Sequence, residues 1–117
     1  MNLAKASKQA QIKREILLQY QENGLLNGVK TSDGSWDYSE KELRRVCFFY
    51  ALQKAGMDLN TLKQYNALLQ KREDTSAERI RILRKCRYRL LDEIHGKQQA
   101  LDRLDYLIYE MKNKKKE

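Results

Sequence analysis

The chain has 117 residues, of which 41% are hydrophobic and 34% are charged, and its formal net charge is +8. This length predicts one domain with an appendage, and the absence of proline favours long helices over a loop-rich or disulfide-stapled fold. No apolar run approaches the ~20 residues that cross a bilayer, and the N-terminus lacks the apolar segment of a signal peptide, so we expect a soluble, cytoplasmic protein. The basic charge favours nucleic acid as the partner.

The N-terminal residues predict two short helices, the first from Leu3 to about Ser7 and the second from Gln11 to about Asn23. The turn between them would fall near residues 8–10. Gly24 ends the second helix, because glycine readily adopts the left-handed conformation that follows a helix. Two short helices joined by a tight turn outline a helix-turn-helix.

Residues 27–37 are rich in glycine, serine, threonine and aspartate, and Asp33-Gly34 is a strong turn signal. The flanking pairs Val29-Lys30 and Trp36-Asp37 predict two brief strands of a hairpin. A hairpin directly after a helix-turn-helix is typical of a wing. An irregular surface loop is the alternative.

Two further helices are expected before residue 71. Ser39 is a good N-cap for the first, and Glu42 would complete a capping box. Gly56 ends this helix, and Asp58 caps the next one, which carries apolar residues up to Leu69. A polar connection over residues 71–75 follows.

A single long helix is predicted from Ser76 to Lys112, with apolar residues at alternating three- and four-residue steps. A lone helix would leave this stripe in water, so we expect a homodimer with a coiled-coil seam. Only Arg87 and Lys97 interrupt the seam. Its apolar positions are Ile80, Leu83, Leu90, Ile94, Leu101, Leu104, Ile108 and Met111.

Together these elements predict a mainly α fold with a winged helix-turn-helix head in residues 1–71. Residues 76–112 form the dimerisation helix, and residues 113–117 form a basic tail that we expect to be disordered. No motif for an enzyme, a metal or a cofactor is present, because Cys47 and Cys86 lack ligand spacing and no glycine-rich phosphate loop occurs.

Four segments, in this order along nearly the whole chain, resemble the MerR family of bacterial transcription regulators. They are ILLQYQENGLL (16–26), YSEKEL (38–43), AGMDLNTLK (55–63) and LDYLIYE (104–110). The resemblance implies a short-form regulator whose long helices pair antiparallel. It also implies a homodimer that binds and distorts a pseudo-palindromic site in double-stranded promoter DNA, with RNA polymerase as a further partner.

The sequence departs from the family pattern at positions that usually hold arginine, which are Leu18 and Trp36 here, and at a usual tyrosine, which is Gln19. These departures leave a second reading open. In it, the protein is a MerR-like adaptor, or an accessory factor that bends DNA, with weakened sequence-specific binding.

The candidate DNA-binding residues come from the recognition helix, the wing and the helix after it. Side chains at the start of a recognition helix reach base edges and phosphates, and arginines after the wing can clamp phosphates. The resemblance adds the tyrosines and the wing lysine as backbone contacts, while Trp36 either lies against DNA or packs on Leu25 and Phe48. The full set is Gln11, Lys13, Arg14, Gln19, Tyr20, Lys30, Trp36, Tyr38, Arg44 and Arg45.

The resemblance also bears on sensing. Metal-sensing relatives carry a cysteine where this chain has Thr75-Ser76, so metal sensing is not expected. Thiol-sensing relatives carry a cysteine at the position of Ala51, one helical turn after Cys47. Cys47 is therefore either a core thiol or, less in keeping with the pattern, a redox thiol.

Overall fold

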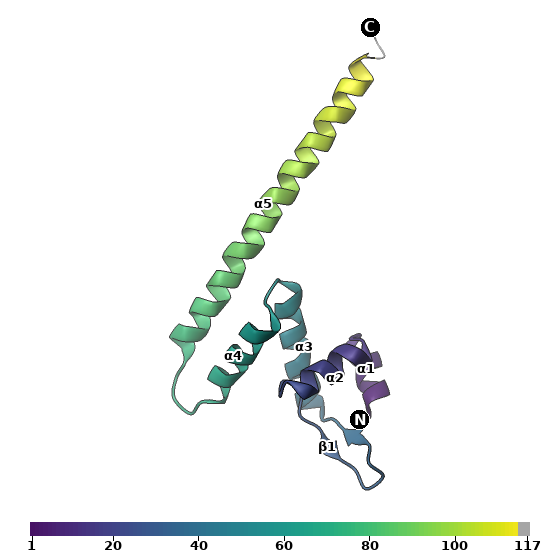
Figure 1. Cartoon of the computed structure of the whole chain (residues 1–117), viewed down its shortest axis with the longest axis vertical. Helices are drawn as coiled ribbons and strands as arrows, with labels where there is room; N and C mark the ends of the chain where they lie inside the picture. Colours follow the sequence, from purple (N-terminus) through teal and green to yellow (C-terminus); the bar gives the residue numbers. More distant parts are fainter. Residues whose placement is uncertain (115–117) are drawn as a thin grey trace.

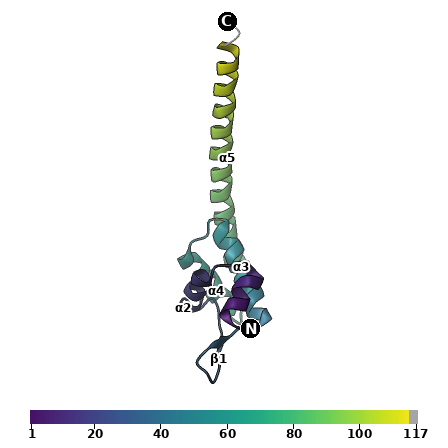
Figure 2. The same ribbon diagram turned by 90° about the vertical axis from the view of Figure 1, so that its right-hand side faces the viewer.

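The computed structural model describes residues 1–114 as a small helical head from which one long helix projects (Figures 1 and 2). The predicted mainly α fold, with a hairpin wing and a long C-terminal helix, is confirmed. In chain order the elements are α1 (Leu3–Ala10), α2 (Arg14–Glu22), β1 (Val29–Lys30), β2 (Trp36–Asp37), α3 (Glu40–Lys54), α4 (Leu59–Gln70) and α5 (Ser76–Lys114).

The overall shape is a rod on a head. The principal extents are 77 × 36 × 18 Å and the radius of gyration is 21.0 Å, whereas a compact chain of this length would have about 13 Å. The excess comes from α5, whose 39 residues span roughly 58 Å at ~1.5 Å per residue. Most of that length lies beyond the head, as Figure 1 shows.

The turn between α1 and α2 lies later than the sequence predicted. α1 runs on to Ala10, and the left-handed residue that ends it is Gln11, with φ of 56°. Ile12 is buried, and its carbonyl accepts a hydrogen bond from the Ser7 hydroxyl. Burial of Ile12 therefore requires the chain to turn at residues 11–13, and α2 starts at Arg14 instead of Gln11.

The predicted wing forms as an antiparallel hairpin in which Val29 pairs with Asp37 and Lys30 with Trp36. At its tip the Asp33 carboxylate accepts from the Ser35 backbone N–H at 3.0 Å, and Gly34 has φ of 86°. The hairpin is therefore an ordered turn, and the alternative of an irregular loop is wrong.

The capping predictions for α3 and α4 hold in part. The Ser39 hydroxyl accepts from the Glu42 N–H at 3.1 Å, and the Asp58 carboxylate accepts from the Thr61 N–H at 2.7 Å. The full capping box predicted at α3 is not formed, because the Glu42 carboxylate accepts from the Asn27 N–H instead, at 3.1 Å. Glu42 thus joins α3 to the segment that leads into the wing.

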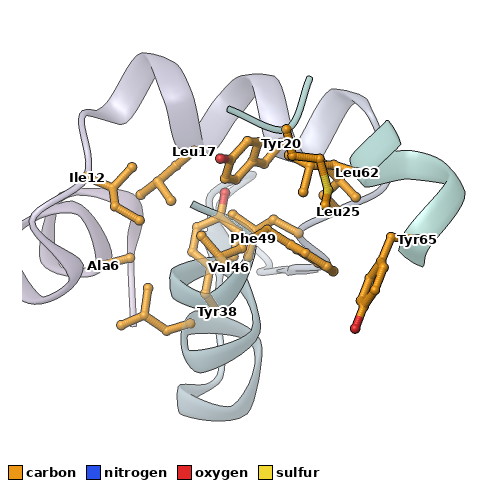
Figure 3. Packing of buried hydrophobic residues seen from close by; sticks show 13 residues of the cluster. Ala6, Ile12, Leu17, Tyr20, Leu25, Tyr38, Val46, Phe49, Leu62 and Tyr65 are labelled. Carbon is orange, nitrogen blue, oxygen red and sulfur yellow. The ribbon is translucent and has the colours of Figure 1, made fainter. Parts of the chain in front are cut away.

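The head has one hydrophobic core, to which α1, α2, α3 and α4 all contribute (Figure 3). Side chains of α2 pack over those of α3, and α4 closes the cluster from the other end. The buried residues are Ala6, Ile12, Leu17, Tyr20, Leu25, Leu26, Tyr38, Leu43, Val46, Phe49, Met57, Leu62 and Tyr65.

α5 adds no fully buried residue to this core. Near its start Ile82, Leu83 and Cys86 pack against the head, and the buried Thr75 hydroxyl donates to the Leu68 carbonyl at 3.0 Å. Within residues 1–114, no helix has the length and apolar character to span a membrane. The tail predicted at 113–117 is wrong for Asn113 and Lys114, which belong to α5, and its remainder lies outside the described residues.

Candidate nucleic-acid interface

The exposed face of α2 carries polar side chains that point away from the core. Leu17 and Tyr20 are fully buried and fix the rotation of the helix. Arg14, Gln19 and the adjoining Lys13 are consequently exposed. Figures 1 and 2 place α2 and the wing in the head, away from the C-terminal end of α5.

The start of α2 lies three residues later than predicted, and this changes where Gln11 and Lys13 lie. Gln11 is exposed but belongs to the turn, so it is not on the recognition helix. Lys13 occupies the N-cap position and makes no side-chain capping bond. Backbone N–H groups at such a helix start favour anions such as phosphate. Gln11 therefore lies beside the N-terminus of α2, a position that favours a contact with phosphate over a contact with a base.

The wing combines an exposed lysine with an aromatic ring. The Lys30 Nζ lies 5.9 Å from the centre of the Trp36 ring, and Trp36 is 38% exposed. The ring also lies against Gly28, where an added Cβ would stand 3.2 Å from Trp36 Cε3. Trp36 thus lies along the wing on the same face as Lys30, with part of its surface open to a partner.

Two predicted DNA contacts are wrong, because Tyr20 and Tyr38 are core residues with exposed fractions of 0% and 1%. The Tyr20 hydroxyl donates to Gln53 Oε1, and the Tyr38 hydroxyl donates to Gln21 Oε1. Burial raises the pKa of Tyr20 to about 12 and also raises the pKa of Tyr38. Both side chains hold the head together and are shielded from DNA.

The two arginines of α3 have different roles. Arg44 is exposed, and its role as a phosphate contact stays a prediction. The guanidinium of Arg45 is half-buried, lies 3.4 Å from Glu42 and donates to Asn66 of α4, and its predicted phosphate contact stays a prediction. It also lies 5.4 Å from the Phe49 ring centre. Arg45 therefore joins α3 to α4.

Sequence reasoning missed Leu18 as a candidate contact. This side chain is 41% exposed on α2, one turn after Arg14. The signal was available, since Leu18 falls outside the buried positions 17 and 20 of the same helix. An apolar side chain on a recognition helix can contact the methyl group of thymine.

The thiols and candidate metal ligands give no site of their own. Cys47 is half-buried against the core, and Cys86 donates from its thiol to the Ala55 carbonyl at 3.6 Å. A redox role for Cys47 stays a prediction. Residues 1–114 contain no group of three histidine, cysteine, aspartate or glutamate side chains that could hold a metal ion.

Comparison with known proteins agrees with this geometry. Residues 1–69 match the MerR HTH family regulatory protein domain. The HTH-type transcriptional regulator AdhR of Bacillus subtilis (strain 168) is 31% identical over 93 residues, which cover 79% of this chain and 66% of that protein. The present chain thus spans about two thirds of that relative's length.

Solved structures show the same fold. A MerR family transcriptional regulator from Listeria monocytogenes is 29% identical, with a TM-score of 0.80 over 92% of this chain and 83% of that one. HiNmlR, a MerR family regulator without its sensor domain that was crystallised with promoter DNA, is 24% identical, with a TM-score of 0.76 over 87% and 78%. The chain therefore belongs to the MerR family of transcription regulators, which are not enzymes.

Proposed function

We propose that this protein is a DNA-binding transcription regulator that acts as a homodimer on a pseudo-palindromic promoter site and distorts the DNA there. The observation that carries the proposal is the pairing of a cationic, exposed recognition helix with a long helix whose apolar stripe, from Ile94 to Met111, is exposed within residues 1–114. Such a role places the protein in the cytoplasm, with RNA polymerase as a further partner at the promoter.

The head offers both kinds of DNA contact. Lys13, Arg14 and Arg44 are exposed cations that suit phosphate, and Arg14 can also reach a guanine edge. Gln19 can donate to phosphate or adenine, and Leu18 can contact thymine. Lys30 and Trp36 on the wing supply one charge and one flat apolar surface for the DNA backbone.

The apolar stripe of α5 supports the homodimer. Ile94, Leu101, Leu104 and Ile108 are each about half exposed, at 50–57%. Apolar stripes of this regularity are buried against another helix in coiled coils. A second copy of α5 is the partner whose length and spacing match this stripe along its whole extent.

Charge favours an antiparallel arrangement of the two helices. Residues 76–90 contain six basic residues and one acidic residue, whereas residues 91–111 contain five acidic and two basic residues. A parallel pair would place the basic halves side by side. An antiparallel pair places each basic half against the partner's acidic half, which attracts.

The seam then has a natural centre. It runs from Ile80 to Met111, and its midpoint falls between His95 and Gly96. Gly96 itself is roughly 140–160° around the helix from the seam residues Ile94 and Leu101, at ~100° per residue, so it lies on the side of α5 away from the partner. In this register Leu90 faces the partner's Leu101.

The test is a footprint on DNA upstream of the gene, followed by a titration of binding against salt. We expect a protected pseudo-palindromic site and a steep fall of affinity with added salt, because phosphate contacts release counterions. Trp36 is the only tryptophan in the chain, so its fluorescence reports engagement of the wing directly.

A matched pair of variants sharpens this test. Arg14→Gln should weaken binding by roughly 1–3 kcal/mol if Arg14 contacts a guanine. Lys63→Gln removes the same charge from the exposed side of α4 and should change little. Equal losses in the two variants, or binding that does not respond to salt, would contradict the proposed interface.

The second candidate function is an adaptor, or an accessory protein that bends DNA with little sequence preference. Leu18 and Trp36, at positions where the family usually carries arginine, favour it. The same footprint separates the two functions. Failure to bind DNA at low salt supports the adaptor, and binding without a protected site supports the accessory protein.

A further inference from the structure

A cavity of about 270 Å³ lies where the head meets α5, outside the DNA-binding residues described above. One wall is the turn from α3 into α4 together with the start of α4, and the other wall is α5. The lining residues are Gly56, Met57, Asp58, Thr61, Gln64, Arg81, Ile82, Lys85, Cys86 and Arg89. The volume lies just below the range of about 300–1,000 Å³ that is typical of small-molecule sites.

The α5 wall is strongly cationic. Arg81, Lys85 and Arg89 follow one another at four-residue steps and so line the same side of the helix. None of the three forms an ion pair with another residue of 1–114. Asp58 is the acidic residue that lines the cavity, and its carboxylate accepts a hydrogen bond from Thr61 as the cap of α4.

The floor of the cavity is less polar than its rim. Met57 is buried with 3% exposed, and Ile82 and Cys86 are partly buried against the core. The Cys86 thiol is directed to the Ala55 carbonyl, which leaves its sulfur as a soft, weakly polar surface. A cationic rim above an apolar floor fits a molecule that has a charged end and an apolar body.

The cavity stays open in the proposed dimer. Lys85 is roughly 140–160° around the helix from the seam residues Leu83 and Leu90, at ~100° per residue. A second α5 on the seam therefore leaves the Lys85 side of the cavity uncovered, while Cys86, roughly 40–60° from Leu90 and Leu83, lies next to the seam. A molecule in the cavity would contact α4 and α5 together and would restrict how the head is set on the long helix.

We propose that this cavity binds a small organic anion, a carboxylate with an apolar body, and that binding changes DNA affinity by fixing the head relative to α5. The binding step is independent of the proposed DNA function. Only the change in DNA affinity rests on that function.

Calorimetry on the full chain tests the binding step with hexanoate, octanoate and 4-phenylbutyrate. We expect saturable binding of at least one carboxylate at one molecule per chain. Inorganic sulfate, which lacks the apolar body, and 4-phenylbutanol, which lacks the charge, should each bind at least tenfold more weakly. No saturation by any of the three carboxylates at millimolar concentration, or equally tight binding of sulfate, would overturn the proposal.

Two double variants locate the site. Arg81→Gln/Lys85→Gln removes two charges from the wall and should weaken carboxylate binding at least tenfold. Arg84→Gln/Arg103→Gln removes two charges from the same helix outside the lining and should leave it unchanged. Equal weakening in both pairs would show general charge attraction and would overturn the site. Carboxylate binding without DNA binding would leave the site standing and contradict only the regulator.

Discussion

The head and α5 differ in how far they bury their apolar side chains. In the head, thirteen apolar side chains are buried with at most 4% exposed, whereas α5 buries none fully over 39 residues. The head satisfies its hydrophobic residues within one chain. The long helix presents the same residue types to solvent, so we propose that a second molecule stabilises it.

This difference separates two kinds of mutational effect. A substitution in the head core acts on folding of the single chain, and its cost depends on the size of the cavity that it leaves. A substitution on the α5 stripe acts on association, so its effect depends on protein concentration. In the proposed regulator DNA binding needs both, because the head would contact the DNA and the dimer would bring two heads to it.

The largest effect is expected from Leu101→Asp/Leu104→Asp on the α5 stripe. Charges placed in the seam should leave a monomer, and loss of the second half-site should weaken DNA binding at least about 100-fold. Sedimentation velocity measures the first result and a gel-shift titration the second. Gln99→Asp/Tyr106→Asp adds two carboxylates on another side of the same helix and should remain dimeric. An intact dimer in the seam variant would refute the seam.

The next effect belongs to the head core. Phe49 is fully buried and packs near Phe48 and Arg45, with ring centres 6.0 Å apart for the two phenylalanines. Phe49→Ala should lower the free energy of unfolding by about 3–5 kcal/mol because it leaves a cavity. Urea denaturation followed by circular dichroism checks this value. Phe48→Ala, at a ring that is 45% exposed, should cost much less.

A smaller effect is expected at the base of the wing. A Cβ at Gly28 would stand 2.8 Å from Tyr38 Cε1, and Tyr38 is held by its buried hydroxyl bond. Gly28→Ala should therefore cost about 1–3 kcal/mol and displace Trp36. A shift in tryptophan emission would report the displacement. The Cβ that Gly34→Ala adds would make no such contact. Its loss of folding stability should come from the positive φ of 86° alone.

The smallest effect is at alkaline pH. Burial raises the pKa of Tyr20 from 10.0 to about 12, so the folded state holds this proton more tightly than the unfolded state. The resulting stability is fully present below pH 10 and is lost as the pH rises from 10 to 12. Between pH 10 and pH 12 the melting temperature of Tyr20→Phe should fall less steeply with pH than that of the parent chain. Identical slopes would show that Tyr20 does not contribute.

Local features of the fold were readable from the sequence, because they depend on neighbours in the chain. Asp33-Gly34 marks the hairpin, and Ser39 and Asp58 mark helix starts through their own side chains. The end of α1 was not readable in this way. Its position depends on Ile12 reaching a core that residues much later in the chain complete.

The candidate site was harder to predict for the same reason. In the sequence Arg45 looks like a surface arginine. Its hydrogen-bond partner Asn66 lies 21 residues later, on α4. Tyr20 and Tyr38 were assigned to DNA by resemblance, while their burial depends on how three helices and the wing pack. Lys13, Arg14, Lys30 and Arg44, which the core does not need, are exposed.

Disulfide trapping on the seam tests the central claim, that α5 completes itself with a second, antiparallel copy. In a chain carrying Cys47→Ser and Cys86→Ser, the double variant Leu90→Cys/Leu101→Cys should form a covalent dimer on mild oxidation, while Leu90→Cys alone should remain monomeric on a denaturing gel. Efficient crosslinking of Leu90→Cys alone would show parallel helices. Absence of crosslinks in the double variant would contradict the proposal that α5 pairs with a second α5.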